Sequence, residues 1–298
     1  MLFRSDYETL YMVADVHTLT TPYDVEELRR YRREVVIDYV AAGLDPDKSV
    51  LFLQADVPEH TELAFYFSSV VSMARMQHLP TFKDKVKQHP EHATMALLNY
   101  PVLMAADILV YQAGFVPVGI DQEPHLEIAR EIARKMNAQY GTDFPEPQRF
   151  ATKGEYVPSL TGEGKMSKSV TGSYINLTDD LETIKKRLAG VPTDAGKGSE
   201  VPSEGGVASL LQLVSLFQGD EARQQYEQAY TSEGLRYQDL KESLAQAIYE
   251  ELQPIQEKRA ELAADSEKLD EIIATGAEKA QAIARETVTE VKERMGLL

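Results

Sequence analysis

The segment GKMSKS carries the residues best suited to chemistry, because it places two lysines three positions apart beside two serines. Lys165 and Lys168 each bear a compact positive charge on a flexible stem, so they can follow phosphate charge that migrates during a reaction. The segment is not a Walker A motif, since Ser159 stands where that motif needs a glycine. A loop that binds an anionic ligand is one interpretation, and a solvated Lys/Ser-rich loop is the other.

A second group of residues shares one face of an expected helix. Tyr100, Met104 and Asp107 stand at i, i+4 and i+7, and we expect Pro101 in the first turn of that helix. An aromatic ring and a thioether beside one carboxylate suit a flat apolar ligand with a single N–H, such as indole. Taken alone, Tyr100 and Met104 are more often core residues, and Asp107 could cap a neighbouring group. An unpaired buried charge is costly, which favours a dedicated partner for Asp107.

The segment FVPVGIDQ leads from an expected strand to a helix N-terminus, the ligand-facing edge of an open α/β sheet. Gly119 allows a close backbone approach, Asp121 can accept hydrogen bonds from ribose hydroxyls, and Gln122 can bond an ammonium group. We expect Val116 and Val118 to alternate on the strand and to wall the apolar part of the site. A helix cap at Asp121 is the alternative.

The histidines receive different interpretations. His17 follows the first expected strand, close to Asp15, where a structural and a functional role are equally compatible with the pattern. We interpret His60 and His125 as structural residues.

Apolar runs alternate with helical patterns in the first half of the chain, which predicts parallel βαβ units. Gly43 should close the first helix and Pro124 should lie in the first turn of a later one. Strands are expected within 10–16, 49–60 and 115–122, and helices over 25–43 and 124–137. Beyond residue 180 we expect a helix, a Gly/Pro/Ser-rich connector over 191–206, and helices to the end, with a kink or break at Pro254.

Composition excludes several classes of protein. The chain has 298 residues, a net charge of -17 and no cysteine. Disulfides, thiolate zinc sites and cysteine-ligated iron–sulfur clusters are therefore excluded. The acidic balance argues against non-specific binding of DNA or RNA. No apolar run reaches the length of a membrane span and no secretory signal opens the sequence, so we expect a cytoplasmic protein without a metal-ligand signature.

Three motifs together resemble one family. Lys165-Met166-Ser167-Lys168-Ser169 is the signature loop of class I aminoacyl-tRNA synthetases, where it stabilises the pyrophosphate that leaves ATP. The segments NYPVLMAADILVYQAGFVPVGIDQEPHLEIAREIARKMN and GAEKAQAIARETVTEVKERMGL resemble bacterial tryptophanyl-tRNA synthetases. The similarity extends from about Tyr7 to the end of the chain.

The resemblance implies a fold, an activity and a set of sites. It implies a Rossmann-like catalytic domain at 1–180 and a helical tRNA-binding domain at 181–298, whose last helix packs back on the first domain. It implies activation of L-tryptophan with ATP and Mg²⁺, transfer to tRNA(Trp), and a homodimer. The implied ATP-binding residues are Gly119, Asp121, Lys165, Met166, Ser167, Lys168 and Ser169, of which Lys165 and Lys168 are catalytic. The implied tryptophan-binding residues are His17, Tyr100, Met104, Asp107, Val116, Val118 and Gln122. The alternatives are a tyrosine-specific relative and a non-catalytic relative that binds tryptophan or RNA.

One expected motif is not in the printed sequence. The family carries a His-Ile-Gly-His-like motif after its first strand, whereas this sequence begins with MLFRSDYETLYMVADVH, which matches the second strand. We expect that MLFRS is not native, that the chain as written fails in pyrophosphate exchange, and that its sheet has an unpaired edge. Restoring about 25 residues with that motif should restore activity and solubility.

Overall fold

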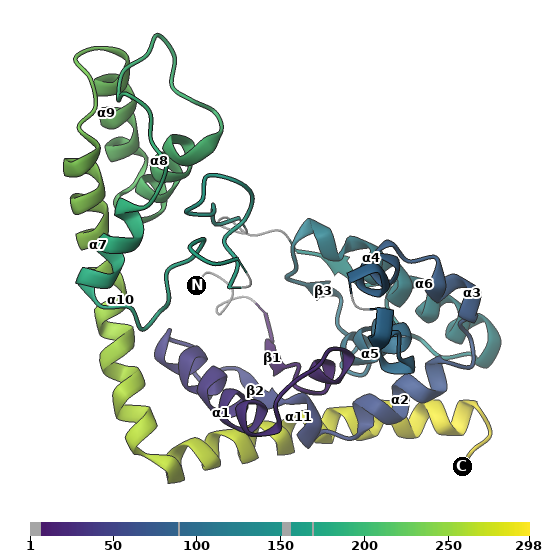
Figure 1. The fold of residues 1–298 in the computed structure, drawn as a ribbon. Helices are drawn as coiled ribbons and strands as arrows, with labels where there is room; N and C mark the ends of the chain where they lie inside the picture. The colour runs from purple at the N-terminus through teal and green to yellow at the C-terminus, as the bar shows by residue number, and fades with distance from the viewer. Residues whose placement is uncertain (1–6, 89, 151–155, 169) are drawn as a thin grey trace. The chain divides into compact units, whose positions relative to one another are not determined.

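The computed structural model describes residues 7–88, 90–150, 156–168 and 170–298, and it divides into two compact units. Unit 1 comprises Met1–Thr152 and Leu262–Leu298, and unit 2 comprises Lys153–Glu261 (Figure 1). Residues 1–6, on which the expectation about MLFRS rests, lie outside the described part of the chain. No helix within that part is both long and apolar enough to cross a membrane.

Unit 1 contains parallel strand pairs, as the sequence predicts. Strand β1 (Leu10–Val13) pairs with β2 (Val50–Leu53), and β3 (Phe115–Val116) pairs with β4 (Gln148–Arg149). In the described residues these four strands form two separate two-stranded sheets. Parallel strands need a crossover connection, and α1 (Val25–Ala41) supplies it between β1 and β2.

The strands are shorter than expected. β3 ends at Val116, so Val118 lies beyond the strand rather than on it. Pro117 has no N–H to donate to a sheet, which limits the length of this strand. β4 was not predicted, because its short segment carries no run of alternating apolar residues. It is held by hydrogen bonds from Gln148 N to Gly114 O and from Phe150 N to Val116 O, both 2.9 Å long.

Two of the expected helices form close to their expected bounds. α1 begins after Asp24, whose side chain accepts a hydrogen bond from Glu27 N, and Gly43 follows its end with a φ of 95°. α6 (Glu123–Tyr140) carries its proline in the first turn and ends at Gly141, which has a φ of 71°. The first helix therefore ends beside the predicted Gly43, whereas α6 continues three residues beyond the expected end at residue 137.

The helix that carries Tyr100 begins earlier than expected. α5 (Met95–Leu109) starts after Thr94, whose side chain accepts a hydrogen bond from Leu97 N. Pro101 therefore lies inside the helix and not in its first turn. A proline cannot donate to the carbonyl four residues earlier, and the buried packing of α5 against its neighbours compensates for that loss.

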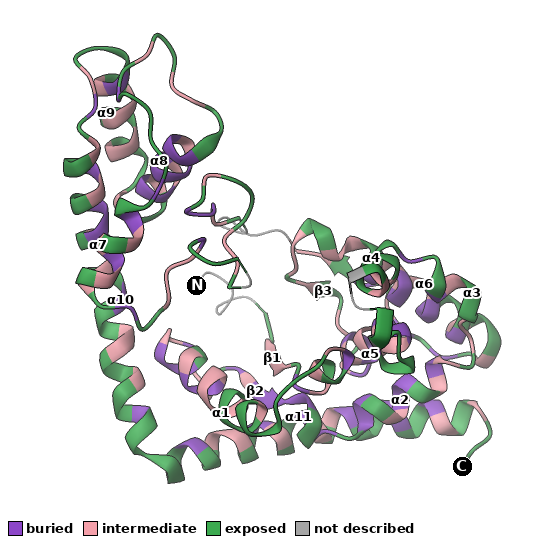
Figure 2. Cartoon of the chain, viewed as in Figure 1, coloured by how far each residue is buried: buried purple, intermediate pink, exposed green. Residues whose placement is uncertain are grey.

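The core of unit 1 lies between helices and strands that are far apart in sequence (Figure 2). α11 (Ser266–Arg294) runs along β2, α1 and α2 (Glu59–Phe67). Its Gly276 faces the carbonyl oxygen of Leu51, and an added Cβ would lie only 1.7 Å from that oxygen. Ala280 and Ala284 continue the same buried face. Small side chains therefore allow α11 to approach the backbone of β2. The remaining helical elements of unit 1 are η2 (Val16–Thr20), η3 (Gln54–Asp56), α3 (Met73–Gln77), α4 (Pro80–Gln88), η4 (Pro90–His92) and η5 (Ile120–Gln122).

Unit 2 has a helical core of its own. Its helices are α7 (Leu181–Ala189), α8 (Gly205–Gln218), α9 (Asp220–Thr231) and most of α10 (Tyr237–Ala264). The expectation of a break at Pro254 is wrong in one respect, because α10 continues through it as a single helix. The connector before α8 is held by Asp194, which accepts hydrogen bonds from the hydroxyls of Tyr230 and Tyr237 at 2.6 Å.

Candidate functional site

The carboxylate of Asp107 on α5 is held by two side chains from other elements. Gln54 Nε2 donates to both carboxylate oxygens, at 2.8 and 2.9 Å, and His60 Nδ1 lies 2.7 Å from Oδ1. His60 is fully buried, whereas the Asp107 side chain remains 12% exposed. Tyr100 and Met104 are half-buried on the same helix. A carboxylate that is nearly buried but still accessible can accept a hydrogen bond from a ligand.

Further hydrogen bonds hold the two side chains that bond Asp107. His60 Nε2 lies 2.8 Å from the Tyr111 hydroxyl, and Gln54 Oε1 accepts from Val16 N at 3.1 Å. Burial, followed by the nearby carboxylates of Asp107 and Glu59, raises the pKa of Tyr111. The sequence did not predict these contacts, because the participating side chains come from separate elements and share no periodicity.

Two aromatic rings pack against the ring of Tyr100. The ring of His17 lies 5.1 Å from it and that of His125 5.3 Å from it, both in edge-on geometry. The Tyr100 hydroxyl is 3.2 Å from His125 Nε2. Burial lowers the pKa of both histidines and raises the pKa of Tyr100. For His17, the negative charge of Asp107 opposes this shift of the pKa.

The VGIDQ segment forms the turn that leads into α6. Gly119 precedes η5, and a Cβ at this position would lie 2.5 Å from Asp121 Oδ1. Gln122 Nε2 donates to Asp121 Oδ2 at 2.9 Å. Gln122, and not Asp121, occupies the N-cap position of α6, and its side chain makes no capping hydrogen bond. Asp121 is exposed, while Val116 and Val118 are half-buried.

The lysine loop belongs to unit 2. Lys165 and Lys168 are exposed, and within the described residues neither ammonium group has an ion-pair partner. The loop backbone is held between them, because Ser173 Oγ accepts from Ser167 N at 3.2 Å and donates to Ser167 O at 2.5 Å. Ser169 lies outside the described residues. The loop therefore has a fixed base and two accessible cations.

The site residues that the sequence suggested fall into two sets. Unit 1 holds His17, Tyr100, Met104, Asp107, Val116, Val118, Gly119, Asp121 and Gln122, and unit 2 holds Lys165, Met166, Ser167 and Lys168. The first set combines apolar surface with one accessible carboxylate and polar groups at a helix N-terminus. The second combines positive charge with a glycine-bounded loop.

Comparison with known proteins gives a consistent result. The model of the class I tRNA synthetases for W and Y matches residues 1–253. The tryptophan–tRNA ligase of Porphyromonas gingivalis is 38% identical over 296 residues, which are 97% of this chain and 90% of that protein. The ligase of Clostridium acetobutylicum is 36% identical over 99% of this chain and 89% of its own length.

Solved structures agree in fold. A tryptophanyl-tRNA synthetase from Campylobacter jejuni, complexed with ADP and tryptophan, has a TM-score of 0.83 and 32% identity. The similarity covers 96% of this chain and 88% of the Campylobacter jejuni chain. The enzyme from Mycoplasma pneumoniae has a TM-score of 0.82 and 30% identity, over 96% of this chain and 87% of its own. The predicted α/β, Rossmann-like fold class is thereby confirmed.

Proposed function

The chain belongs to the class I tRNA synthetases for tryptophan and tyrosine, and from this premise we propose how its residues perform the reaction of a tryptophan–tRNA ligase. Such an enzyme joins the carboxylate of L-tryptophan to the α-phosphate of ATP and releases pyrophosphate. It then transfers the acyl group to the terminal ribose of tRNA(Trp). Both steps depend mainly on positioning and on stabilising phosphate charge.

The accessible carboxylate of Asp107 is the observation that carries the choice of tryptophan. Indole N–H can only donate, whereas the phenol of tyrosine both donates and accepts. An acceptor-only group on an apolar helix face matches the first ligand. A ligand without the N–H would leave one acceptor position of that carboxylate unfilled and shielded from water, which is costly. Met104 supplies apolar surface beside it, and we assign the walls of the indole site to Val116 and Val118.

The remaining groups of unit 1 suit the polar parts of the substrates. We assign the tryptophan ammonium group to Gln122, with Tyr100 and His17 lining the same end of the site. Asp121 is exposed and acceptor-rich, so it suits ribose hydroxyls, and Gly119 leaves room for its carboxylate.

The lysine loop suits the ATP phosphates. Lys165 and Lys168 carry accessible positive charge that can meet the charge developing on pyrophosphate as it leaves. Met166, Ser167 and Ser169 complete the loop, and backbone and hydroxyl groups there can donate to phosphate oxygens.

Magnesium would enter with ATP. In the described part of the chain, no group of three or more His, Asp or Glu side chains is arranged to hold a metal ion. We propose that phosphate oxygens and water hold most of the Mg²⁺ coordination sphere, which is the usual binding mode of this ion beside a nucleotide. The ion would neutralise part of the negative charge of the phosphates. Lys165 and Lys168 would supply the positive charge that the protein itself contributes.

Tryptophan-dependent exchange of pyrophosphate into ATP tests the proposed function. We would measure it with the chain as printed and with the same chain preceded by the family's His-Ile-Gly-His-like segment. Exchange that depends on tryptophan, in either form, supports the proposal. Exchange with tyrosine instead, or with neither amino acid in both forms, contradicts it.

We assign the tRNA contacts to the helical region of residues 181–298, and a cytoplasmic location follows from a role in protein synthesis.

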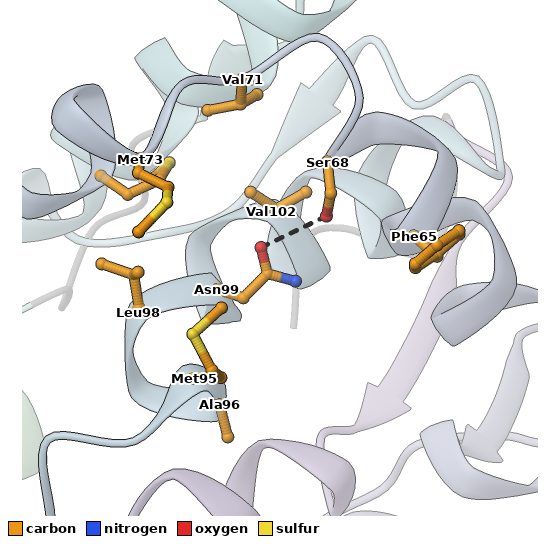
Figure 3. Close-up of a pocket in the computed structure, with 10 residues that line it drawn as sticks. Phe65, Ser68, Val71, Met73, Met95, Ala96, Leu98, Asn99 and Val102 are labelled. Carbon is orange, nitrogen blue, oxygen red and sulfur yellow. Dashed lines mark hydrogen bonds between the residues drawn. The ribbon is translucent and has the colours of Figure 1, made fainter.

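We also propose a homodimer, because two-fold assembly is the common arrangement. An apolar groove of about 490 Å³ between α2, α3 and α5 supports this proposal (Figure 3). Phe65, Met73 and Met95 line it, and they are 77%, 63% and 69% exposed. Exposed apolar side chains that gather around a groove suit an interface, and its occupant would be the same face of a second copy.

Charge placed in this groove should therefore separate the protomers. We expect a Phe65→Asp, Met95→Asp double variant to sediment as a monomer under conditions where the parent is a dimer, since the two buried charges would lack partners. Leu216→Asp, at an exposed position of unit 2, is the control and should remain dimeric. A monomeric parent or a dimeric double variant would show that the groove has another purpose.

A further inference from the structure

A continuous chain of hydrogen bonds lies behind Asp107, and the roles assigned so far do not use it. It runs from Val16 N through Gln54 to Asp107, and from there through His60 to Tyr111. Gln54 is 1% exposed and His60 is completely buried. The links join residues that are 38 to 53 positions apart in the sequence, so they depend on the tertiary fold.

The direction of every hydrogen bond in this chain follows from its partners. Gln54 Oε1 accepts from Val16 N–H, so the amide nitrogen of Gln54 must face Asp107. An ionised carboxylate can only accept, so His60 carries a hydrogen on Nδ1. In the neutral imidazole, Nε2 is then an acceptor, and the Tyr111 hydroxyl donates to it. The hydroxyl of Tyr111 thereby selects the tautomer that presents N–H to Asp107.

The two oxygens of Asp107 are left in different states. Oδ1 accepts from Gln54 and from His60, whereas Oδ2 accepts from Gln54 alone. An acceptor with a single bond retains capacity for one more donor. Because the side chain is 12% exposed, that capacity is open to a ligand.

We propose that Gln54, His60 and Tyr111 are positioning residues that hold Asp107 with one free acceptor position on Oδ2. This arrangement makes the site select a ligand with one N–H donor. The inference rests on the proposed function, since it concerns the same amino-acid site. None of the three touches the ligand in this account, and each acts through the orientation of the carboxylate.

A purely structural role predicts something different. Buried polar groups are normally hydrogen-bonded whether or not they serve a site. If the network only stabilised the fold, its loss would lower the melting temperature of the protein and would weaken the binding of all ligands equally. If the network orients Asp107, its loss will weaken the binding of tryptophan. The binding of an analogue whose ring N–H is replaced by sulfur will not change.

The parent chain offers a direct measurement, because it contains no tryptophan residue. When tryptophan is excited at a wavelength that tyrosine does not absorb, its fluorescence therefore reports the ligand alone, and the sulfur analogue is measured by displacement. We expect His60→Leu and Gln54→Met to lose about tenfold in the preference for tryptophan over the analogue, as for a hydrogen bond that orients a charged group. Tyr111→Phe should lose less, because the Nδ1 bond survives in part of the population. Affinity for the analogue should stay within about twofold in all three.

His60→Asn is the matched variant. Its amide nitrogen can take the place of Nδ1 and donate to Asp107, although its bond to Tyr111 is lost. We expect it to regain most of the preference that His60→Leu loses, whatever its melting temperature. Asp107→Asn, which removes the acceptor charge itself, should show the largest loss of preference.

The outcomes separate the two proposals. A parent that binds tryptophan in neither of the two forms used for the exchange test contradicts the proposed function and this inference with it. A parent that prefers tryptophan, with Gln54 and Tyr111 variants that prefer it equally well, contradicts the inference alone. Equal weakening of both ligands, or no recovery in His60→Asn, would assign the network to the fold. If His60→Leu does not fold, the nearly isosteric Tyr111→Phe and Gln54→Met decide the question.

Discussion

Replacing Lys165 or Lys168 by alanine should slow tryptophanyl-adenylate formation by about 10²- to 10³-fold, which is the usual cost of removing a group that stabilises transition-state charge. Affinity for tryptophan should change by no more than about twofold. Both ammonium groups are exposed and have no ion-pair partner among the described residues, so their removal does not disturb the fold. A loss confined to the rate indicates an interaction made only in the transition state.

Single-turnover formation of the adenylate measures the rate, and fluorescence of bound tryptophan measures the affinity. Each variant is compared with a parent chain of the same length that is prepared in the same way. Lys186→Ala is the control, because it removes an equal charge from the exposed surface of α7 in the same unit. Equal losses of rate and affinity in Lys165→Ala would contradict the assigned role.

The second large effect concerns the packing of α11. Gly276→Ala should destabilise unit 1 by about 3 kcal/mol or more, at or above the upper end of typical overpacking costs. The new Cβ would lie 1.7 Å from Leu51 O and 2.7 Å from Leu51 C, and neither backbone atom can move without shifting β2. Helix propensity alone predicts the opposite sign, because alanine is favoured over glycine by about 1 kcal/mol in a helix. The sign of the change therefore shows which effect dominates.

Thermal and urea denaturation measure this change. Gly114→Ala is the matched control, because a Cβ there meets no atom within 4 Å. We expect the control to unfold at the parent's midpoint, and Gly276→Ala to unfold earlier and to bind tryptophan more weakly, since Gln54 follows β2 directly. A Gly276→Ala variant as stable as the parent would mean that α11 does not lie this close to β2 in solution.

The sequence by itself determined the features that depend on neighbouring residues. The 3.6-residue period and the terminal signals predicted α1 and α6 almost to their bounds, because a helix is closed by bonds between residues four apart. The buried runs predicted parallel strands, although β1 and β3 end earlier than the runs themselves. The contiguous lysine motif and the segments 99–137 and 276–297 together identified the family, since each is a continuous string of residues.

The tertiary structure decided whatever depends on residues far apart in sequence. β4 has no pattern of its own and exists only because β3 lies beside it. Pro101 was misplaced, because the start of α5 is set by Thr94 and the interior proline is tolerated through packing. The sequence also did not predict which groups bond the carboxylate of Asp107. Its helix face could be read from spacing, but its partners Gln54 and His60 come from other elements, and only the folded chain brings their donors within hydrogen-bonding distance of the carboxylate.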